Sequence, residues 1–171
     1  LRRAVVTGEY RYEEQLELRP RARDGRLGYE QVVPLATADG IVLVNRGFIA
    51  DAAGSASDTP QTRGVIRVTG TVRPDQGTSR LGPQNPESGL LTTIARIDTN
   101  RLADQFGAEL YPIYLDLVSE TPAAGGIPTE LPMLPEPTNR PHLLYSIQWW
   151  TFAAIAAIGW VIYLRKQFGS Q

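Results

Sequence analysis

Near the C-terminal end, one histidine and two aromatic residues recur at a spacing that could hold a metal-containing cofactor. His142, Tyr145 and Trp149 fall at positions i, i+3 and i+7, so they share one face if the segment is helical. Neutral imidazole is the usual protein donor to haem iron, and flat aromatic rings pack against a macrocycle. Two interpretations stay open: His142 is an axial haem ligand, or the aromatic residues anchor a helix at a membrane interface while the histidine bonds to headgroups or water.

A second group of residues, Asn45-Arg46-Gly47-Phe48, places a charge at the end of an apolar strand. Arg46 follows the apolar run of residues 41–44, where burial of a guanidinium costs free energy unless the group is paired. One interpretation is a structural arginine bonded to carbonyl groups or to a carboxylate. The other is a residue at the rim of the domain that binds a carboxylate of a ligand or partner.

The composition excludes several classes of chemistry. The chain has no cysteine, one histidine and one methionine, so it lacks disulfides, thiolate metal sites, attached c-type haem, a thiol nucleophile and the soft ligands of a copper carrier. The net charge of -1, without a basic run, gives no reason to expect nucleic acid as a partner. Because the soft ligands are missing, we expect no bound copper. No nucleophile and base occur at a spacing that specifies a reaction, so we expect no enzymatic activity either.

The first element to consider is a predicted membrane helix, which would carry His142, Tyr145 and Trp149. Residues 149–164 carry no charge, and with residues 143–148 they form 22 residues, or roughly 33 Å of helix against a hydrocarbon core of about 30 Å. Arg165 and Lys166 follow directly, and a basic flank favours the cytoplasmic side. The preceding domain would then be exported, yet the chain begins Leu1-Arg2-Arg3 without an apolar signal. We therefore expect a membrane-spanning or signal segment upstream of this sequence.

The first 120 residues read as short strands separated by turns. Asp39-Gly40 is a strong hairpin signal between the predicted strands 28–35 and 41–50. Asp98 predicts the N-cap of a short helix that ends at about Phe106, with Gly107 as the stop. The predicted strands are residues 4–10, 15–19, 28–35, 41–50, 65–72 and 111–118.

The predicted fold class is therefore mainly β: an antiparallel barrel- or sandwich-like extracytoplasmic domain with one short helix, followed by a C-terminal transmembrane helix. The domain would span residues 1–120. A spacer with six prolines over residues 121–141 would be stiff and extended. The membrane helix would occupy residues 142–164 and a cytoplasmic tail residues 165–171.

Taken together, the motifs of this chain resemble those of the SURF1 family of cytochrome c oxidase assembly factors. The resemblance spans nearly the whole chain, and its most specific parts are the Asn-Arg-Gly-aromatic and His-x-x-Tyr-x-x-Gln-Trp pieces. Phe48 stands where the family often has Trp, and Pro141 stands where the family has Asn directly before its His. The matching runs are Val6-Thr7-Gly8-Glu9-Tyr10, Gly28-Tyr29, Val33-Pro34-Leu35, Val42 to Phe48, Val68-Thr69-Gly70-Thr71-Val72 and His142 to Trp150.

The resemblance implies two membrane helices with the extracytoplasmic domain between them, in the plasma membrane of a bacterium. It also implies haem a as a bound group, held either stably or transiently, with His142 as the residue that matches the family's histidine. The expected partners are cytochrome c oxidase core subunit I, haem a synthase and the lipid bilayer. Cofactor contacts would fall on His142, Tyr145 and Trp149, and partner or structural roles on Asn45, Arg46, Gly47, Phe48, Gln148 and Trp150.

Three functions stay open. The first is an assembly factor that holds haem a while it is placed in the oxidase core subunit. The second is an accessory structural subunit that stays bound to the mature oxidase or to a respiratory supercomplex. The third, an enzyme, is the least favoured because the sequence offers neither a nucleophile–base pair nor a set of metal ligands.

Overall fold

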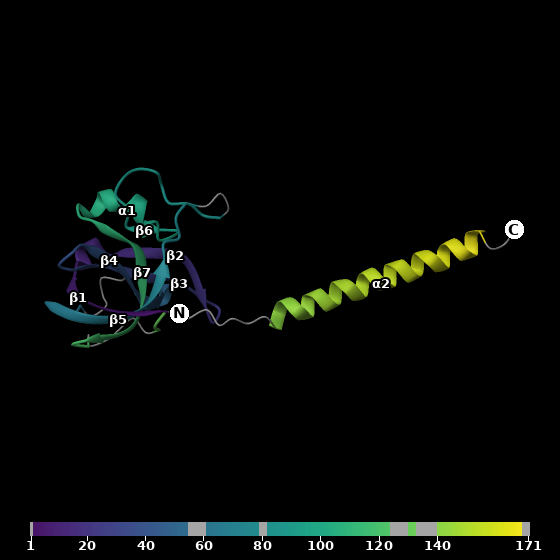
Figure 1. Cartoon of the computed structure of the whole chain (residues 1–171), viewed down its shortest axis with the longest axis horizontal. Coiled ribbons are helices and arrows are strands. Elements are labelled where there is room, and N and C mark those ends of the chain that lie inside the picture. Colours follow the sequence, from purple (N-terminus) through teal and green to yellow (C-terminus); the bar gives the residue numbers. More distant parts are fainter. Residues whose placement is uncertain (1, 55–60, 79–81, 124–129, 133–139, 169–171) are drawn as a thin grey trace. The chain divides into compact units, whose positions relative to one another are not determined.

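The chain folds as two compact units, Leu1–Met133 and Leu134–Gln171 (Figure 1). The computed structural model describes residues 2–54, 61–78, 82–123, 130–132 and 140–168, and the side chains of the second unit from Tyr145 onward. The first unit is mostly β-sheet with one short α-helix, and the second contains one long helix. The predicted fold class, a mainly β domain followed by a helix that could span a membrane, is confirmed.

The described residues of the first unit contain seven strands in one sheet and three short helical segments. The strands are β1 (Arg3–Tyr10), β2 (Leu16–Arg23), β3 (Arg26–Ala36), β4 (Ile41–Ala50), β5 (Val65–Pro74), β6 (Thr93–Ile94) and β7 (Leu110–Thr121). The short helical segments are the 3-10 turns η1 (Tyr12–Glu14) and η2 (Asp51–Ala53) and the α-helix α1 (Thr99–Phe106).

The sheet closes on itself, so of the two predicted forms the domain is a barrel. Its strand order is β1-β5-β7-β4-β3-β2-β6, and β1 also pairs with β3. The closing contact joins Glu9 to Ala36 and Tyr10 to Leu35. Strands β1, β5, β7, β4 and β3 therefore form the ring, while β2 and β6 extend the sheet beyond β3. Most neighbours are antiparallel, but β4 pairs with β7, and β2 with β6, in parallel.

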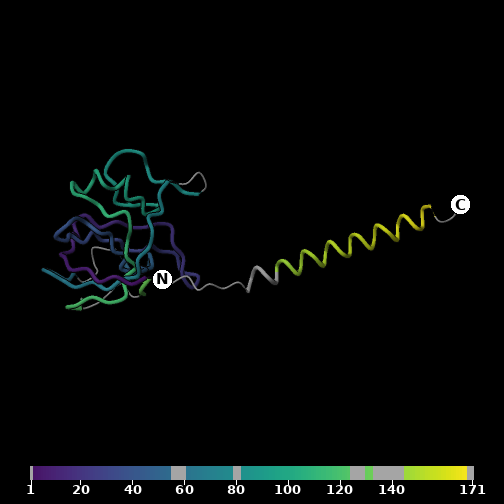
Figure 2. Tube along the Cα trace, in the orientation of Figure 1, coloured from purple at the N-terminus to yellow at the C-terminus, as the bar shows by residue number. Residues whose placement is uncertain are grey.

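Strand β4 lies at the centre of the packing because both of its faces are buried. Val42 and Val44 belong to the apolar cluster inside the ring, whereas Ile41 and Leu43 belong to the cluster on the other side of the strand. Helix α1 covers this second cluster, and Figures 1 and 2 show it on the same side of the domain as β6 and the segment before it. The outer cluster contains Leu91, Ile94, Ile97, Leu102 and Phe106 from this layer.

Local signals at two turns are confirmed in detail. The Asp98 side chain accepts a hydrogen bond from the Arg101 N–H, and Gly107 ends α1 in the left-handed conformation with φ 60°. The Thr37 N–H donates to the Gly40 carbonyl at 2.8 Å and closes the β3–β4 hairpin. These two turns fix where α1 and β4 begin.

Strand β6 and the 3-10 turns η1 and η2 were not predicted. Strand β6 consists of two residues and pairs with Glu17 and Leu18 of β2. So short a strand has no periodicity of its own, and only the tertiary contact defines it. The turn η1 lies between the predicted strands 4–10 and 15–19, and its residue Tyr12 is buried.

Helix α2 (Arg140–Phe168) is longer than the predicted residues 142–164. Backbone hydrogen bonds continue through Arg165 and Lys166, which are good helix formers. The segment Tyr145–Phe168 has a mean hydropathy of 1.5 and is long and apolar enough to cross a membrane. Its large apolar side chains are exposed within the unit, as expected of a helix that meets lipid or another protein.

Part of the predicted spacer belongs to the folded domain. Strand β7 extends to Thr121, and the Glu130 carbonyl accepts a 2.8 Å hydrogen bond from the Phe48 N–H of β4. Residues 124–129 and 133–139 of the predicted spacer lie outside the described residues. The chain therefore returns to the barrel at Glu130 before the second unit begins.

We predict that a fragment of residues 1–132 folds without α2 and that a fragment ending at Ser119 is much less stable. The shorter fragment lacks Glu120, the buried partner of Arg46, and Glu130, which pairs with β4. Circular dichroism should show a β-type spectrum and a cooperative melt for the longer fragment. Equal melting temperatures for the two fragments would contradict this role of Glu120 and Glu130.

Candidate functional site

Residues 45–48 form a β-bulge in β4. Asn45 pairs with Val32 of β3 and Gly47 pairs with Gln31, so Arg46 is the extra residue on the bulged strand. The Asn45 side chain stabilises this shape because its Oδ1 accepts a hydrogen bond from the Gly47 N–H at 3.0 Å. The bulge directs the Arg46 side chain into a buried polar cluster.

Arg46 is fully buried and is paired with a carboxylate. Its Nη2 lies 3.1 Å from Oε1 of Glu120 on β7, and both side chains have 0% exposure. Its Nη1 donates to Gln31 Oε1 at 3.4 Å, and the guanidinium carbon lies 5.2 Å and 5.4 Å from the ring centres of Tyr10 and Tyr12. The π faces of both tyrosines can therefore stabilise the positive charge of Arg46 by cation–π interactions.

Two hydroxyl groups donate hydrogen bonds to the Glu120 carboxylate. The Tyr10 hydroxyl donates to Glu120 Oε2 at 3.2 Å, and the Thr62 hydroxyl donates to Oε1 at 3.4 Å. The Thr62 N–H in turn donates to the Tyr12 hydroxyl at 3.1 Å. Burial, and then the nearby Glu120 charge, raise the pKa of Tyr10 far above its usual value, so this hydroxyl stays protonated and remains a donor.

This geometry is the one described by the first interpretation of Arg46, a structural arginine bonded to a carboxylate of its own chain. A rim residue that binds a partner would need an accessible guanidinium, and this one is enclosed. Asn45 and Phe48 are also buried, at 3% and 2% exposure. Residues 45–48 therefore hold the barrel together and do not present a surface to a ligand.

A second buried carboxylate lies on the other side of Asn45. Asp116 of β7 accepts a 3.1 Å hydrogen bond from Asn45 Nδ2, and Arg73 Nε lies 3.3 Å from its other oxygen. Burial raises the pKa of Asp116 to about 6, although Arg73 and Asn45 favour the ionised form. The group that supports the bulge therefore titrates close to neutral pH.

Gly47 and Phe48 join the bulge to the segment that returns from β7. Gly47 has φ 122°, and a β-carbon at this position would overlap the Glu130 carbonyl. Only glycine allows this close approach. The approach places the Phe48 N–H in hydrogen-bond contact with Glu130.

Two arginines of the β2–β3 hairpin fix the returning segment from the other side. Arg23, which is buried, donates to the carbonyl oxygens of Glu130 and Leu131 at 3.1 Å and 3.0 Å. Arg26 forms an ion pair with the Glu130 carboxylate. Arg26 first, and Arg23 second, lower the pKa of Glu130. The last described residues before α2 are thus firmly held on the barrel.

The other predicted site residues lie in the second unit, on α2. Tyr145, Trp149 and Trp150 are 64%, 69% and 77% exposed, and Gln148 is exposed as well. The His142 backbone is helical, which places residues 142, 145 and 149 along one stripe of the helix. Trp149 also meets Phe152 edge to face at 6.2 Å, which extends the aromatic surface along this stripe. The His142 side chain lies outside the described residues.

Sequence reasoning missed the acidic partners Glu120, Asp116 and Glu130. A signal for the first two exists, because both interrupt or end the apolar strand β7, where a carboxylate must be paired if it is buried. An arginine within apolar β4 is the complementary signal. Neither signal says which residues meet, since the pairing depends on the parallel contact of β4 with β7. Glu130 carries no such signal in its proline-rich context.

We predict that Asp116 makes the domain less stable as the pH rises from 4 to 7. Its folded pKa of about 6 exceeds the ordinary 3.8, so the stabilising contribution of the protonated form is present below pH 3.8 and is lost through about pH 6. The resulting loss in the free energy of unfolding is at most roughly 3 kcal/mol. Urea titrations of the 1–132 fragment should show a loss of stability in the wild type that Asp116→Asn lacks.

The matched control is Asp104→Asn, which changes an exposed carboxyl group on α1. This variant should keep the wild-type dependence on pH. If Asp116→Asn and wild type lose the same free energy of unfolding between pH 4 and 7, Asp116 does not titrate as its burial implies.

Comparisons with known proteins match almost the whole chain to one family. The model of the SURF1 family matches residues 1–154, which include both residues 45–48 and residues 142–150. A SURF1-like protein of Monosiga brevicollis is 28% identical over 99% of this chain and 68% of its own length. An uncharacterized SURF1-like protein of Mycobacterium tuberculosis is 29% identical over 92% of this chain and 58% of its own length.

A SURF1-like protein of Caenorhabditis elegans is 26% identical over 96% of this chain and 56% of its own length. The chain thus spans between 56% and 68% of the length of these relatives. The resemblance found in the sequence motifs is confirmed by a family match that covers the barrel and the first half of α2. The chain belongs to the SURF1 family, whose members are generally known as cytochrome oxidase assembly factors.

Proposed function

We propose that this protein is an assembly factor for haem–copper cytochrome c oxidase that assists the delivery or placement of haem a in core subunit I. The observation that carries this proposal is the SURF1 family match over residues 1–154, which includes the His142 to Trp150 run at the start of α2. The protein would act as a carrier or guide for haem a and would leave its chemistry unchanged.

The donor chemistry of the chain fits one axial ligand to haem iron. His142 is the one histidine of the sequence, and it begins a helical stripe on which Tyr145 and Trp149 are exposed. Neutral imidazole would bind the iron, and the aromatic rings would cover part of the apolar macrocycle. No cluster of three or more metal-binding side chains occurs among the described residues. The sequence holds no second histidine, so a second axial ligand would come from another part of the protein or from a partner.

We further propose that α2 spans the plasma membrane of a bacterium with the barrel on the extracytoplasmic side. Arg165 and Lys166 lie in the last turn of the helix, and basic flanks are retained on the cytoplasmic side. This orientation puts His142 at the outer interface of the bilayer. Core subunit I and haem a synthase, two integral membrane proteins, would meet the helix at that depth.

The helix and the barrel would have different roles in this function. Because residues 45–48 are enclosed by their own domain, they support the barrel and do not contact haem. The exposed stripe of α2 would make the haem contact. Surfaces of the barrel outside this motif would contact the partner proteins.

We predict that His142→Ala lowers both the haem a retained by the detergent-solubilised full chain and the yield of haem-loaded oxidase. His142→Gln should be nearly as harmful, because an amide of similar size is a poor ligand for haem iron. Loss need not be complete, since the apolar face of haem a still buries against Tyr145, Trp149 and lipid. Absorbance spectra of the purified protein and of the oxidase measure both quantities.

The matched control is Trp150→Ala, which removes an exposed ring next to Trp149 but off the His142 stripe. It should retain more haem than His142→Ala. If His142→Ala leaves haem content and oxidase activity unchanged at normal protein levels, the haem role is wrong. Stoichiometric co-purification with active oxidase would then indicate an accessory subunit.

A further inference from the structure

Strand β1 has an unpaired edge over its first half. Residues 3–9 pair with β5 along one edge, whereas only Glu9 and Tyr10 pair with β3 along the other edge. In the described part of the chain, no strand lies along the other edge of residues 3–7. Alternate N–H and C=O groups of these residues therefore point away from the sheet, as on any edge strand.

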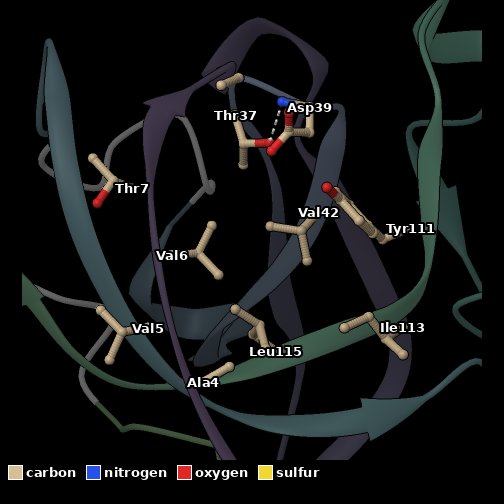
Figure 3. Close-up of a pocket in the computed structure, with 11 residues that line it drawn as sticks. Ala4, Val5, Val6, Thr7, Thr37, Asp39, Val42, Tyr111, Ile113 and Leu115 are labelled. Carbon is tan, nitrogen blue, oxygen red and sulfur yellow. Dashed lines mark hydrogen bonds between the residues drawn. The ribbon is translucent and has the colours of Figure 1, made fainter.

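This free edge borders an apolar groove of about 390 Å³ between β1, the β3–β4 turn and the start of β7 (Figure 3). The four consecutive residues 4–7 all line the groove, although neighbouring side chains of a strand point to opposite faces. The groove therefore follows the edge of β1. Across from β1, its wall is formed by Val42, Ile113 and Leu115, with Tyr111 near the turn.

The two ends of the groove carry opposite charges. Figure 3 shows Asp39 beside the groove at the β3–β4 turn and Ala4 at the other end. Arg3 directly precedes Ala4 in the sequence. Both side chains are exposed, and neither forms an ion pair with another residue that the structure describes. A ligand with a cation at one end and a carboxylate at the other would complement this arrangement.

We propose that this groove binds an extended polypeptide segment of a partner protein, which adds to the sheet as a strand along β1. The segment carries apolar residues at alternate positions, a Lys or Arg next to Asp39 and an Asp or Glu next to Arg3. It runs antiparallel to β1, because β3 approaches the same edge antiparallel and leaves it at Ala36. A lipid chain could fill the apolar wall but could not pair with the backbone of β1.

This inference is independent of haem binding, because it concerns the barrel and not α2. It assigns the barrel a surface for partner recognition, which residues 45–48 do not provide. The groove lies where β1 and β7 begin, whereas the buried ion pair joins Arg46 in the middle of β4 to Glu120 near the end of β7. Substitutions in the groove can therefore be tested without disturbing that cluster.

The test uses the peptide acetyl-Lys-Val-Ser-Val-Ser-Val-Glu-amide with the full chain in lipid nanodiscs. Binding should slow hydrogen exchange of the amides of residues 3–7, and calorimetry gives the dissociation constant. Two further peptides carry N-methyl groups, one on the Val nitrogens and one on the Ser nitrogens. Only one of these sets faces β1, so one peptide should bind at least about tenfold more weakly while the other stays near the parent.

Charge reversal tests the direction of the segment. The peptide with Glu first and Lys last should bind about threefold more weakly than the parent, as expected for two exposed ion pairs. The double variant Arg3→Glu with Asp39→Lys should reverse this preference, and both residues are exposed, so the fold is retained. Equal binding of both N-methylated peptides would overturn the proposal in favour of an apolar ligand. Unchanged exchange at residues 3–7 with every peptide would also overturn it.

Discussion

The ion pair between Arg46 and Glu120 is the interaction on which the rest of the barrel depends. Both side chains are fully buried, and further hydrogen bonds offset the cost of removing such a pair from water. Tyr10 and Thr62 supply these bonds to Glu120, and Gln31 supplies one to Arg46. The Nε of Arg46 has no hydrogen-bond partner among the described residues. The pair thus connects β4 and β7 directly. Its hydrogen bonds also connect these two strands to β1, to β3 and to the segment before β5. A change that removes one partner leaves an uncompensated charge in the interior.

The bulge links this ion pair to residues 130–132, the last described residues before α2. Because Arg46 is the inserted residue, Gly47 takes a positive φ and Phe48 presents its N–H to Glu130. Arg23 and Arg26 then hold Glu130 from the neighbouring hairpin. The same few residues therefore close the barrel interior and determine where the chain leaves it. This explains, in physical terms, why an Asn-Arg-Gly-aromatic sequence is a structural requirement of this strand.

Sequence reasoning located the elements whose signals are local. The β3–β4 hairpin follows from Asp39-Gly40, α1 from Asp98 and Gly107, and α2 from its apolar length. It could not assign Glu120 to Arg46 or Glu130 to Phe48, since these contacts join strands far apart in the chain. It also missed β6, whose two residues are defined only by their pairing with β2. For the candidate site, the sequence identified the stripe of His142, Tyr145 and Trp149, but it left the role of Arg46 open until the fold placed that residue in the interior.

A double-mutant cycle on Arg46 and Glu120 tests this account most directly. The free energy of unfolding should be measured by urea titration for Arg46→Met, Glu120→Gln and the double variant, alongside the oxidase yield of cells that carry each variant. We expect each single change to cost about 3–5 kcal/mol and the double change to cost less than their sum, with oxidase yield falling in step with stability. A fully stable Arg46→Met protein that nevertheless fails to support oxidase assembly would contradict the account and would make Arg46 a residue for binding a partner.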